Sequence, residues 1–332
     1  MGYRQSSSFK YILVSIIAVL LIAAILLAAI VMDGQNVSIE WRGEEKILEF
    51  DGETYILKEN VETFLVLGLD KYDENIISDS YNNNQQADFL MLMVFDHDAK
   101  TYSTIHINRD TMVEVDVLGV AGDVIGTQNK QIALSHTYGK GGSISNSNTA
   151  KAVSKLLCGV KIRHYMSLTL DSIPLMNELV GGVTLEVLDD FTGVEGVEGV
   201  EKLIKGETIT LTPELAQLYV QHRKELEDST NATRMERQRQ YLEAMRVQIE
   251  EKIETDNEFL TQTVIKMADY MESDCSSTRL QEIGKKMQEY EFVQINDIKG
   301  ESKVGKGGHM EFYPDENDLK RVVIDLFYVP KT

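Results

Sequence analysis

Residues 63–70 have the sequence TFLVLGLD, an apolar run that ends in an acidic residue. An unbroken apolar run of this length is typical of a strand that is buried on both faces. Two further strand-like runs follow, DFLMLMVF at 88–95 and TYSTIHIN at 101–108, and the segment DHDAK joins them. We therefore predict three strands, the last two paired as an antiparallel hairpin.

The predicted hairpin brings polar side chains to one of its ends. If Phe95 opposes Thr101, the antiparallel register places Asp88 opposite Asn108, with Asp110 one diagonal position further. Directly opposed residues share a face, so we expect these three side chains to lie about 5 to 8 Å apart. A shift of one residue in the register would scatter them.

Arg109 lies at the same end of the hairpin, and its partner position holds Gln86. Carboxylates that converge beside an arginine can hold Mg²⁺ against phosphate oxygens. Acidic residues also occur at strand ends without any ligand. From these residues alone both interpretations stay open.

The flanking segments predict further elements. Residues 47–58, ILEFDGETYILK, alternate around Asp51-Gly52 and predict a small hairpin, whereas the polar residues 71–86 predict a long loop. Thr212-Pro213 predicts the start of a helix, and Thr233 is the predicted cap of the next one. The other predicted elements are a glycine-rich loop at 131–142, helices at 150–157 and 172–180, strands at 161–169 and 183–188, and charged helices from 250 that end in a strand, VVIDLFYVP, at 322–330.

An uncharged run at residues 11–32, YILVSIIAVLLIAAILLAAIVM, is long enough to cross a hydrocarbon core of about 30 Å. A cleaved signal peptide is the alternative, but its apolar region is usually shorter, about 7 to 15 residues. Arg4 and Lys10 precede the run, so we expect a cytoplasmic tail at residues 1–10 and an external main domain.

Composition limits the classes of function. The 332 residues carry a formal charge of −20, with a pI of about 4.7, which argues against nucleic acid as the main partner. Cys158 and Cys275 are too few for a disulfide framework, have no metal-ligand spacing, and are predicted to be buried. His106 and His136 have no cysteine or serine partner at a telling spacing, so we interpret both as structural.

Basic residues concentrate in one stretch, YVQHRKELEDSTNATRMERQRQ at 219–240. From Ala232 on, helical spacing places Arg234, Gln238, Tyr241 and Met245 on one face, which is also the apolar face. A guanidinium on a packing face needs a carboxylate or phosphate partner. The stretch therefore indicates either a pocket for an anionic ligand or a basic helix face that forms surface ion pairs.

Several segments, taken in order, resemble the LytR-CpsA-Psr (LCP) family of envelope glycopolymer ligases. The resemblance covers about Val61 to Ile249, more than half of the chain. The segments that carry it are Gly68-Leu69-Asp70, Gln86-Ala87-Asp88, Ile107-Asn108-Arg109-Asp110-Thr111, residues 130–142, Val180-Gly181-Gly182-Val183 and residues 216–238.

The resemblance implies an α/β fold, with a mixed sheet flanked by helices on both faces, behind one N-terminal transmembrane helix. It places a membrane-proximal hairpin and linker at 33–60, the LCP-like domain at 61–250, and a C-terminal helical extension ending in a strand at 251–332. The implied protein is a single-pass cell-membrane protein whose main domain is extracellular.

The activity implied is a Mg²⁺-dependent phosphotransferase that moves a glycopolymer from an undecaprenyl pyrophosphate carrier onto peptidoglycan. Its partners would be the carrier-linked glycopolymer, peptidoglycan and the cytoplasmic membrane, with no nucleic acid. Such chemistry depends on positioning and charge neutralisation more than on covalent help.

By resemblance, each site residue acquires an expected role. Asp70 and Asp88 are the expected metal ligands, and Asp110 is either a base or a partner for an arginine. We expect Arg109, Asp110 and Arg223 to be catalytic. The expected pyrophosphate-binding residues are Arg109, Arg223, Arg234, Arg237, Gln238, Gln86 and Gln221.

The chain departs from the family pattern at four positions. Gln86 and Gln221 stand where the family has arginine, Asn231 stands where it has aspartate, and Lys71 stands where an arginine often follows the aspartate. Two missing guanidinium groups would remove several kcal/mol of contact energy if each contributes about 1.5 to 3 kcal/mol. The alternative function is a catalytically impaired scaffold or regulator that binds lipid-linked or polymeric anions in envelope assembly.

Overall fold

The structure is a computed structural model that describes residues 47–70, 83–223, 226, 230–256 and 258–331. Its described part divides into two compact units. Unit 1 contains residues 170–271 and 276–292, and unit 2 contains residues 47–169, 272–275 and 293–331.

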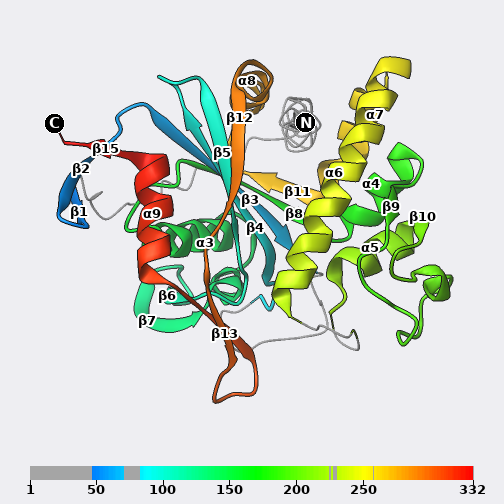
Figure 1. Ribbon diagram of the computed structural model, residues 1–332, viewed down its shortest axis with the longest axis horizontal. Coiled ribbons are helices and arrows are strands. Elements are labelled where there is room, and N and C mark those ends of the chain that lie inside the picture. Colours follow the sequence, from blue (N-terminus) through cyan, green and yellow to red (C-terminus); the bar gives the residue numbers. More distant parts are fainter. Residues whose placement is uncertain (1–46, 71–82, 224–225, 227–229, 257, 332) are drawn as a thin grey trace, which may run out of the picture. The chain divides into compact units, whose positions relative to one another are not determined.

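A six-stranded sheet of order β11-β8-β3-β4-β5-β12 forms the centre of unit 2 (Figure 1). The pair β3–β8 is parallel, whereas β3–β4 and β4–β5 are antiparallel, so the sheet is mixed. Its strands are β3 (Val61–Leu69), β4 (Ala87–Asp96), β5 (Thr101–Ile107), β8 (His164–Thr169), β11 (Met271–Ser273) and β12 (Glu291–Asp297). The three predicted central strands and the hairpin are confirmed.

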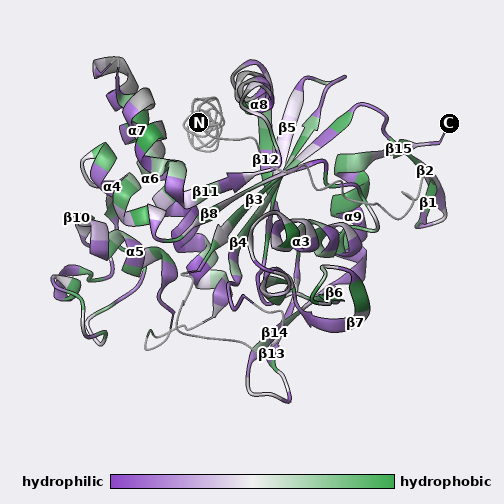
Figure 2. Cartoon of the chain, turned by 180° about the vertical axis from the view of Figure 1, so that it is seen from behind, coloured by the Kyte–Doolittle hydropathy of each residue, from purple (hydrophilic) through white to green (hydrophobic). Residues whose placement is uncertain are grey.

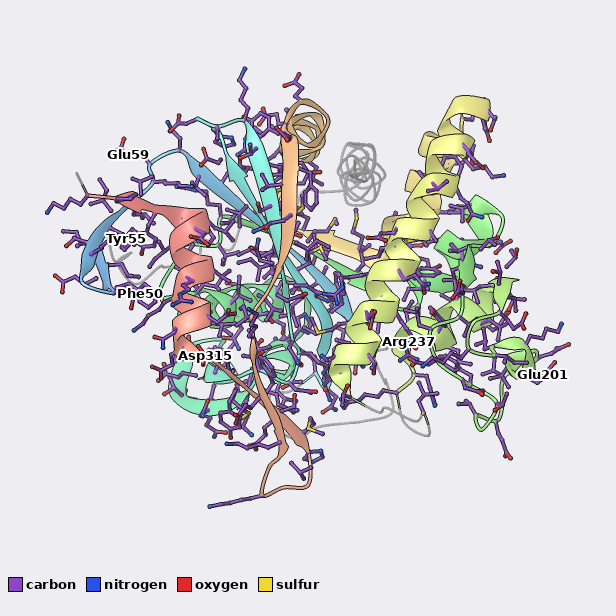
Figure 3. The ribbon with its side chains drawn as sticks, in the orientation of Figure 1. Phe50, Tyr55, Glu59, Glu201, Arg237 and Asp315 are labelled. Atoms are coloured by element: carbon purple, nitrogen blue, oxygen red, sulfur yellow. The ribbon has the colours of Figure 1, made fainter. Side chains whose placement is uncertain are left out.

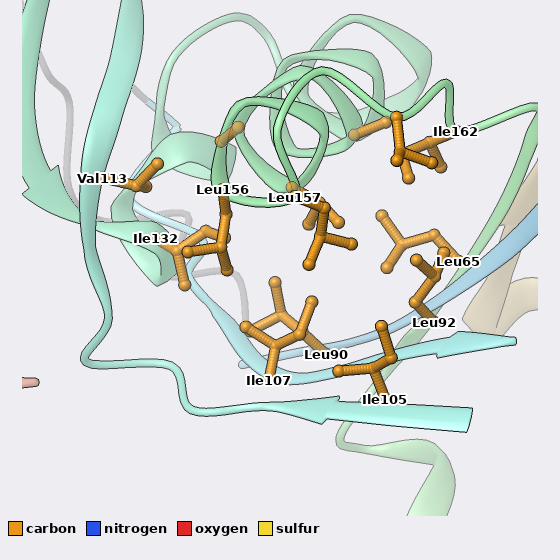
Figure 4. Packing of buried hydrophobic residues seen from close by; sticks show 14 of the residues in the cluster. Leu65, Leu90, Leu92, Ile105, Ile107, Val113, Ile132, Leu156, Leu157 and Ile162 are labelled. Atoms are coloured by element: carbon orange, nitrogen blue, oxygen red, sulfur yellow. The ribbon is translucent and has the colours of Figure 1, made fainter. Parts of the chain in front are cut away.

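Hydrophobic side chains explain why these strands lie at the centre. Leu65 of β3 is paired with Leu92 of β4, and Leu92 with Ile105 of β5, and all three are fully buried. This face packs against α3 (Gly142–Leu156), which contributes Leu156, and against Leu157 just after it (Figure 4). The opposite face of the strands is buried as well, which is why the runs are apolar without alternation.

The helix α3 begins eight residues before the predicted start at Ala150. Its first half, GSISNSNT, is polar and has no apolar spacing from which a helix could be predicted. In the structure these polar side chains are buried and hydrogen-bonded. Asn146 donates to the Ser167 hydroxyl at 2.9 Å, and Asn148 donates to the Ser135 carbonyl at 2.8 Å. Hydrogen bonds to other segments hold this part of α3 in place. It has no apolar face by which a helix could be recognised in the sequence.

Smaller sheets complete unit 2. The predicted hairpin at 47–58 is confirmed as β1 (Ile47–Phe50) and β2 (Glu53–Leu57), and Asp51 and Gly52 have the positive φ angles of 51° and 79° that its two-residue turn requires. The remaining strands are β6 (Met112–Leu118), β7 (Val124–Gln131), β13 (Gly300–Val304), β14 (Met310–Pro314) and β15 (Tyr328–Pro330), which joins β2.

The prediction of one strand over residues 322–330 is wrong for its first six residues. They belong to α9 (Glu316–Phe327), and only Tyr328–Pro330 form a strand. Asp315 caps the helix by accepting hydrogen bonds from the amides of Asn317 and Asp318 (Figure 3). Apolar and polar residues alternate along α9 with helical spacing (Figure 2), and its apolar face joins the core of unit 2.

The segment from residue 251 is not purely helical either. It supplies β11, β12, β13 and β14 in addition to helices, and β11 and β12 form the two edges of the central sheet. The pairing partners of an edge strand are distant in sequence, and for this reason the charged composition of the segment did not reveal these strands.

Unit 1 is mainly helical, with α4 (Ser172–Val180), α5 (Pro213–Gln221), α6 (Asn231–Thr255), α7 (Phe259–Met267), α8 (Ser277–Glu289) and the two-stranded sheet of β9 (Thr184–Glu186) and β10 (Thr208–Thr210). The predicted helix at 172–180 is confirmed, and Gly181 ends it in the left-handed conformation. The predicted helix start is confirmed, because α5 begins at Pro213, and Thr212 caps it. The cap of α6 is Thr230 and not Thr233, because the Thr230 hydroxyl accepts from the Thr233 amide.

Two predictions fall outside the described residues. These are the transmembrane helix at 11–32 and most of the loop at 71–86, of which only 83–86 are described, as chain outside any helix or strand. Within the described part of the chain, none of the helices combines the length and the apolar character needed to span a membrane.

The central core yields a stability prediction. Leu92→Ala removes a fully buried side chain between β3, β5 and α3, and we expect the free energy of unfolding to fall by about 2 to 5 kcal/mol. Chemical denaturation monitored by circular dichroism measures the change. Val120→Ala, at a side chain that is 79% exposed, is the control and should have almost no effect. Equal stability of the two variants would contradict this description of the core.

Candidate functional site

The predicted site residues of unit 2 gather at one end of the central sheet, where β3 ends and β4 begins. We call these residues the acidic set: Asp70, Gln86, Asp88, Arg109 and Asp110. A chain of contacts runs from Asp70 through Gln86 to Arg109 and its two carboxylate partners.

Asp70 follows β3 directly and is held by the chain that leads into β4. Its backbone amide donates to the Gln86 carbonyl at 3.0 Å, and its Oδ1 accepts from the Gln86 amide. Burial, followed by the charge of Asp88, raises the pKa of Asp70 to about 6. Burial and the Asp88 charge both destabilise the ionised form of Asp70. A nearby cation would stabilise that form, so this position favours one.

The register of β4 and β5 differs by one residue from the prediction. Tyr102, and not Thr101, opposes Phe95, so continuing the ladder places Asp88 opposite Arg109 and not Asn108. The Arg109 Nη1 atom lies 2.7 Å from Asp88 Oδ1. We expected a shift of one residue to scatter the charged residues. Instead, it joins Asp88 and Arg109 in an ion pair.

Arg109 lies at the centre of the acidic set. Its Nη2 donates to the Gln86 side-chain carbonyl, and its Nε lies 3.7 Å from Asp110 Oδ1. Its side chain is 11% exposed. Because three groups hold the planar guanidinium, its orientation is fixed before any ligand arrives.

Asp110 is fully buried, and its surroundings favour the role of an arginine partner over that of a base. Its Oδ1 accepts from Gln131 Nε2 at 3.0 Å, and the same nitrogen donates to the Met310 carbonyl at 2.6 Å. Gln131 was not among the predicted site residues. No spacing in the sequence connects Gln131 to Asp110. Gln131 ends β7, and it comes close to Asp110 only because β7 pairs with β6.

The predicted site residues of unit 1 lie at the end of α5 and in the first turns of α6. We call them the basic set: Gln221, Arg223, Arg234, Arg237 and Gln238. The predicted helix face is confirmed, because Arg234, Gln238, Tyr241 and Met245 are all buried. The Arg234 Nη2 donates to Asn231 Oδ1 at 2.5 Å.

Arg237 is the most deeply buried cation among the residues that the structure describes (Figure 3). Its Nε lies 3.4 Å from Asp189 Oδ2, and its guanidinium carbon lies 5.1 Å from the centre of the Phe191 ring and 5.8 Å from that of Tyr219. Burial lowers the pKa of Arg237 from its ordinary value, and the charge of Asp189 opposes that change. No sequence pattern pointed to Asp189, which follows β9 in a loop.

Two residues of α6 hold the end of α5. Arg237 Nη2 donates to the His222 carbonyl, and Gln238 Nε2 donates to the Val220 carbonyl at 3.1 Å. These carbonyls flank Gln221 and precede Arg223, both of which are half-buried. The buried members of the basic set therefore fix the backbone that carries its less buried members.

The chemistry of the acidic set fits a divalent cation. Asp70 and Asp88 are two carboxylates close enough for the charge of one to raise the pKa of the other. Mg²⁺ takes oxygen ligands, commonly from one or two carboxylates together with phosphate oxygens. Arg109 is paired with Asp88, so Asp70 is the carboxylate of these two that has, among the described residues, no cationic side chain paired with it in an ion pair.

The two histidines that the sequence singled out are confirmed as buried, and His136 is structural. Its ring nitrogens pair with the Gln85 carbonyl at 3.0 Å and with Asn146 Oδ1 at 3.2 Å. Burial lowers the pKa of His136 to about 4. Cys275 is buried as predicted, whereas Cys158 is half-buried and was predicted wrongly.

Comparison with known proteins identifies relatives over most of the chain. A model of the LytR_cpsA_psr family matches residues 30–325. No curated protein matches. Among solved structures, TagV from B. subtilis is similar with 22% identity and a TM-score of 0.56, over 81% of this chain and 97% of that one.

Two other solved structures are similar. TagT bound to LI-WTA has 19% identity and a TM-score of 0.57, over 81% of this chain and 90% of that one. The gbs0355 protein from Streptococcus agalactiae has 15% identity and a TM-score of 0.62, over 80% and 86% of the two chains. At these identities the likeness establishes the fold, which is a mixed sheet with helices.

The pKa of Asp70 predicts a dependence of stability on pH. The folded pKa of about 6 lies above the ordinary value of about 3.9, so ionisation of Asp70 opposes folding. The protonated form of Asp70 contributes to the free energy of unfolding. This contribution is fully present below about pH 4 and is lost as the pH rises through about 6. Asp70→Asn keeps the Oδ1 acceptor without the charge. In magnesium-free buffer its Tm should therefore rise relative to the parent between pH 4 and pH 7.

The exposed Asp325→Asn is the control for the loss of one negative charge. Differential scanning calorimetry at several pH values compares the three proteins. A difference between Asp70→Asn and the parent that stays constant from pH 4 to pH 7 would contradict the assignment of a raised pKa to Asp70.

The burial of Arg237 predicts a large effect on stability. Arg237→Ala leaves Asp189 without its cationic partner and the His222 carbonyl without its donor, so the free energy of unfolding should fall by about 3 to 5 kcal/mol. Urea denaturation measures the loss. Lys205→Ala removes an exposed cation from the same unit and should change little. A small effect at Arg237 would show that it has no part in holding α5.

Proposed function

Because this chain belongs to the LytR_cpsA_psr family, we propose that it transfers a glycopolymer from a polyprenyl pyrophosphate carrier to peptidoglycan. Family membership supports the general role of a cell-wall glycopolymer transferase. The observation that carries the finer proposal is Arg109, which Asp88, Gln86 and Asp110 hold in a fixed orientation at the sheet end that also carries Asp70.

The acidic set supplies the means to bind a diphosphate. A fixed guanidinium donates paired hydrogen bonds to phosphate oxygens and loses little freedom on binding. Asp70 and Asp88 would hold Mg²⁺, which when bound neutralises charge on the pyrophosphate. Asp110 and Gln131 act through Arg109, since both are engaged with protein groups and hold it in place.

The basic set supplies further groups of the kind that bind phosphate. Arg223 and Arg234 are the phosphate-binding members, whereas Arg237 and Gln238 position the backbone before Arg223. The amino-terminal end of α6 adds backbone amides, whose partial positive charge favours an anion. TagT, one of the similar structures, is bound to LI-WTA, and this supports a glycopolymer as the substrate class.

The proposed location is the outer face of the cytoplasmic membrane. The apolar run at 11–32 would anchor the protein once, with residues 1–10 in the cytoplasm and the main domain outside. The carrier lipid and the peptidoglycan acceptor are both accessible there. The family match begins at residue 30, where this apolar run ends.

A second candidate function is a binding protein that has lost turnover. The contact between Gln86 and Arg109 favours this function. Gln86 stands where the family has a second arginine, and its side-chain amide occupies one edge of the Arg109 guanidinium. One fewer cation would weaken the stabilisation of charge that develops during transfer. Binding of the carrier would persist while the rate of reaction fell.

The experiment uses the full-length chain in detergent with undecaprenyl pyrophosphate as the probe. We expect Mg²⁺-dependent binding by calorimetry and a Mg²⁺-dependent release of phosphate. Arg109→Ala should weaken binding by about 10- to 100-fold, which corresponds to the loss of one charge-assisted contact of about 1.5 to 3 kcal/mol. Arg321→Ala removes an exposed arginine of the same unit and serves as the control.

Each outcome has one meaning. Phosphate release that Arg109→Ala abolishes supports the transferase. Tight binding without release supports the impaired relative. The proposal fails if the parent protein does not bind the carrier, or if Arg109→Ala and Arg321→Ala bind it equally well.

A further inference from the structure

The opposite end of the central sheet carries a second group of chemically reactive side chains. His164 begins β8, and Asp274 and Cys275 follow the edge strand β11, which pairs with β8. One ligand atom from each of these residues lies within 4.8 Å of the other two. We call the three residues the His–Asp–Cys cluster, and all of them belong to unit 2.

The separation within this cluster suits a metal ion. His164 Nδ1 lies 3.7 Å from Asp274 Oδ2. Two ligands of a tetrahedral zinc ion, each about 2.0 to 2.2 Å from the metal, are about 3.3 to 3.6 Å apart. The His164 and Asp274 ligand atoms therefore need to move together by only a few tenths of an ångström. The Cys275 sulfur needs to move by up to about 1 Å, and its longer bond to zinc, about 2.3 Å, reduces that movement.

Backbone hydrogen bonds hold two of the three ligands in place. The Asp274 Oδ1 accepts from the Tyr165 amide at 2.8 Å, which directs Oδ2 toward His164. The Ser273 hydroxyl donates to the Tyr165 carbonyl at 2.6 Å and accepts from the Cys275 amide at 3.1 Å. The short segment at 273–275 is thus fixed to β8 from both sides.

Glu62 supplies the second feature of a metal site. Its Oε1 lies 3.8 Å from His164 Nε2, the ring nitrogen opposite to the one that faces Asp274, and its Oε2 lies 3.1 Å from His97 Nε2. Glu62 is only 3% exposed. A histidine that binds a metal commonly donates its other ring N–H to a carboxylate, which fixes the ring and its tautomer.

The cluster lies far from the acidic set. Glu62 is near the start of β3 and Asp70 follows its end, eight residues later, so the two ends of the strand are roughly 26 Å apart at about 3.3 Å per residue. A metal ion at the His–Asp–Cys cluster could not contact a substrate held by Asp70. The cluster is also partly open, since the side chains of His164 and Asp274 are 24% and 20% exposed.

We propose that His164, Asp274 and Cys275 bind a zinc ion, with water at the fourth position and Glu62 supporting His164. On binding, Cys275 loses its thiol proton to the solvent, and the thiolate and Asp274 balance the two positive charges. Thiolate and imidazole ligands select zinc over Mg²⁺ and Ca²⁺, which prefer oxygen. The ion joins β8 to the segment after β11 and so stabilises this edge of the sheet.

The sequence could not indicate this site, because 110 residues separate His164 from Asp274. Zinc ligands are recognised in a sequence when they come as closely spaced pairs. Here only one adjacent pair exists, Asp274-Cys275, and it acquires its partner through the pairing of β11 with β8.

The test uses the full-length protein after treatment with a chelator. Zn²⁺ is titrated against a chromophoric competitor, and Co²⁺ serves as a spectroscopic substitute. We expect one equivalent of Zn²⁺ to bind. The Co²⁺ form should show a thiolate-to-cobalt charge-transfer band and the intense visible bands of a four-coordinate ion. Cys275→Ser and His164→Ala should each weaken binding by at least about 100-fold.

Matched controls separate this site from other cysteines, histidines and carboxylates. Cys158→Ser and His309→Ala should leave the affinity and the spectrum unchanged. Asp70→Asn should also leave both unchanged, so the result does not depend on the proposed transferase activity. Glu62→Gln keeps all three ligands and should weaken binding by about 10- to 100-fold, which provides a test even if a ligand variant fails to fold.

Two results would overturn the proposal. One is the absence of stoichiometric Zn²⁺ binding to the parent protein. The other is a cobalt spectrum without the thiolate band, or one that Cys275→Ser leaves intact. Zn²⁺ should in addition raise the Tm of the parent protein and of Cys158→Ser but not that of Cys275→Ser.

Discussion

The ion pair between Arg109 and Asp88 is the interaction on which the acidic set depends. It exists because the register of β4 and β5, extended past the strand ends, places Asp88 opposite Arg109. A hydrophobic core fixes that register, since moving either strand by one residue would turn Leu92 and Ile105 away from α3. Packing on one face of the sheet thus decides which charges meet at its end.

The same dependence of reactive groups on packing recurs in unit 1. Arg237 and Gln238 are buried on the apolar face of α6, and from there they bind carbonyl groups at the end of α5. Their charge and polarity are used inside the protein, to hold the segment that carries Arg223. The stretch that first indicated an anion site therefore contains at least one arginine, Arg237, whose contacts lie within the protein.

The strand β3 joins two different chemical environments. Its carboxyl end leads to Asp70, an oxygen ligand beside a guanidinium, which suits phosphate chemistry and Mg²⁺. Its amino end holds Glu62 between His97 and His164, beside a thiol, which suits a softer metal. The apolar centre of the strand keeps the two ends apart, so each can take its own ion.

The sequence by itself determined the central strands, the first hairpin, α4 with its glycine stop, and the buried face of α6, because these follow from local periodicity and turn chemistry. The series of motifs also indicated the family and most residues of both sets. Tertiary structure alone decided the register that pairs Asp88 with Arg109, the burial of the polar half of α3, the contacts of Gln131 and Asp189, and the His–Asp–Cys cluster. Each of these depends on groups that are distant along the chain and meet only when strands pair and side chains pack, which no local pattern encodes.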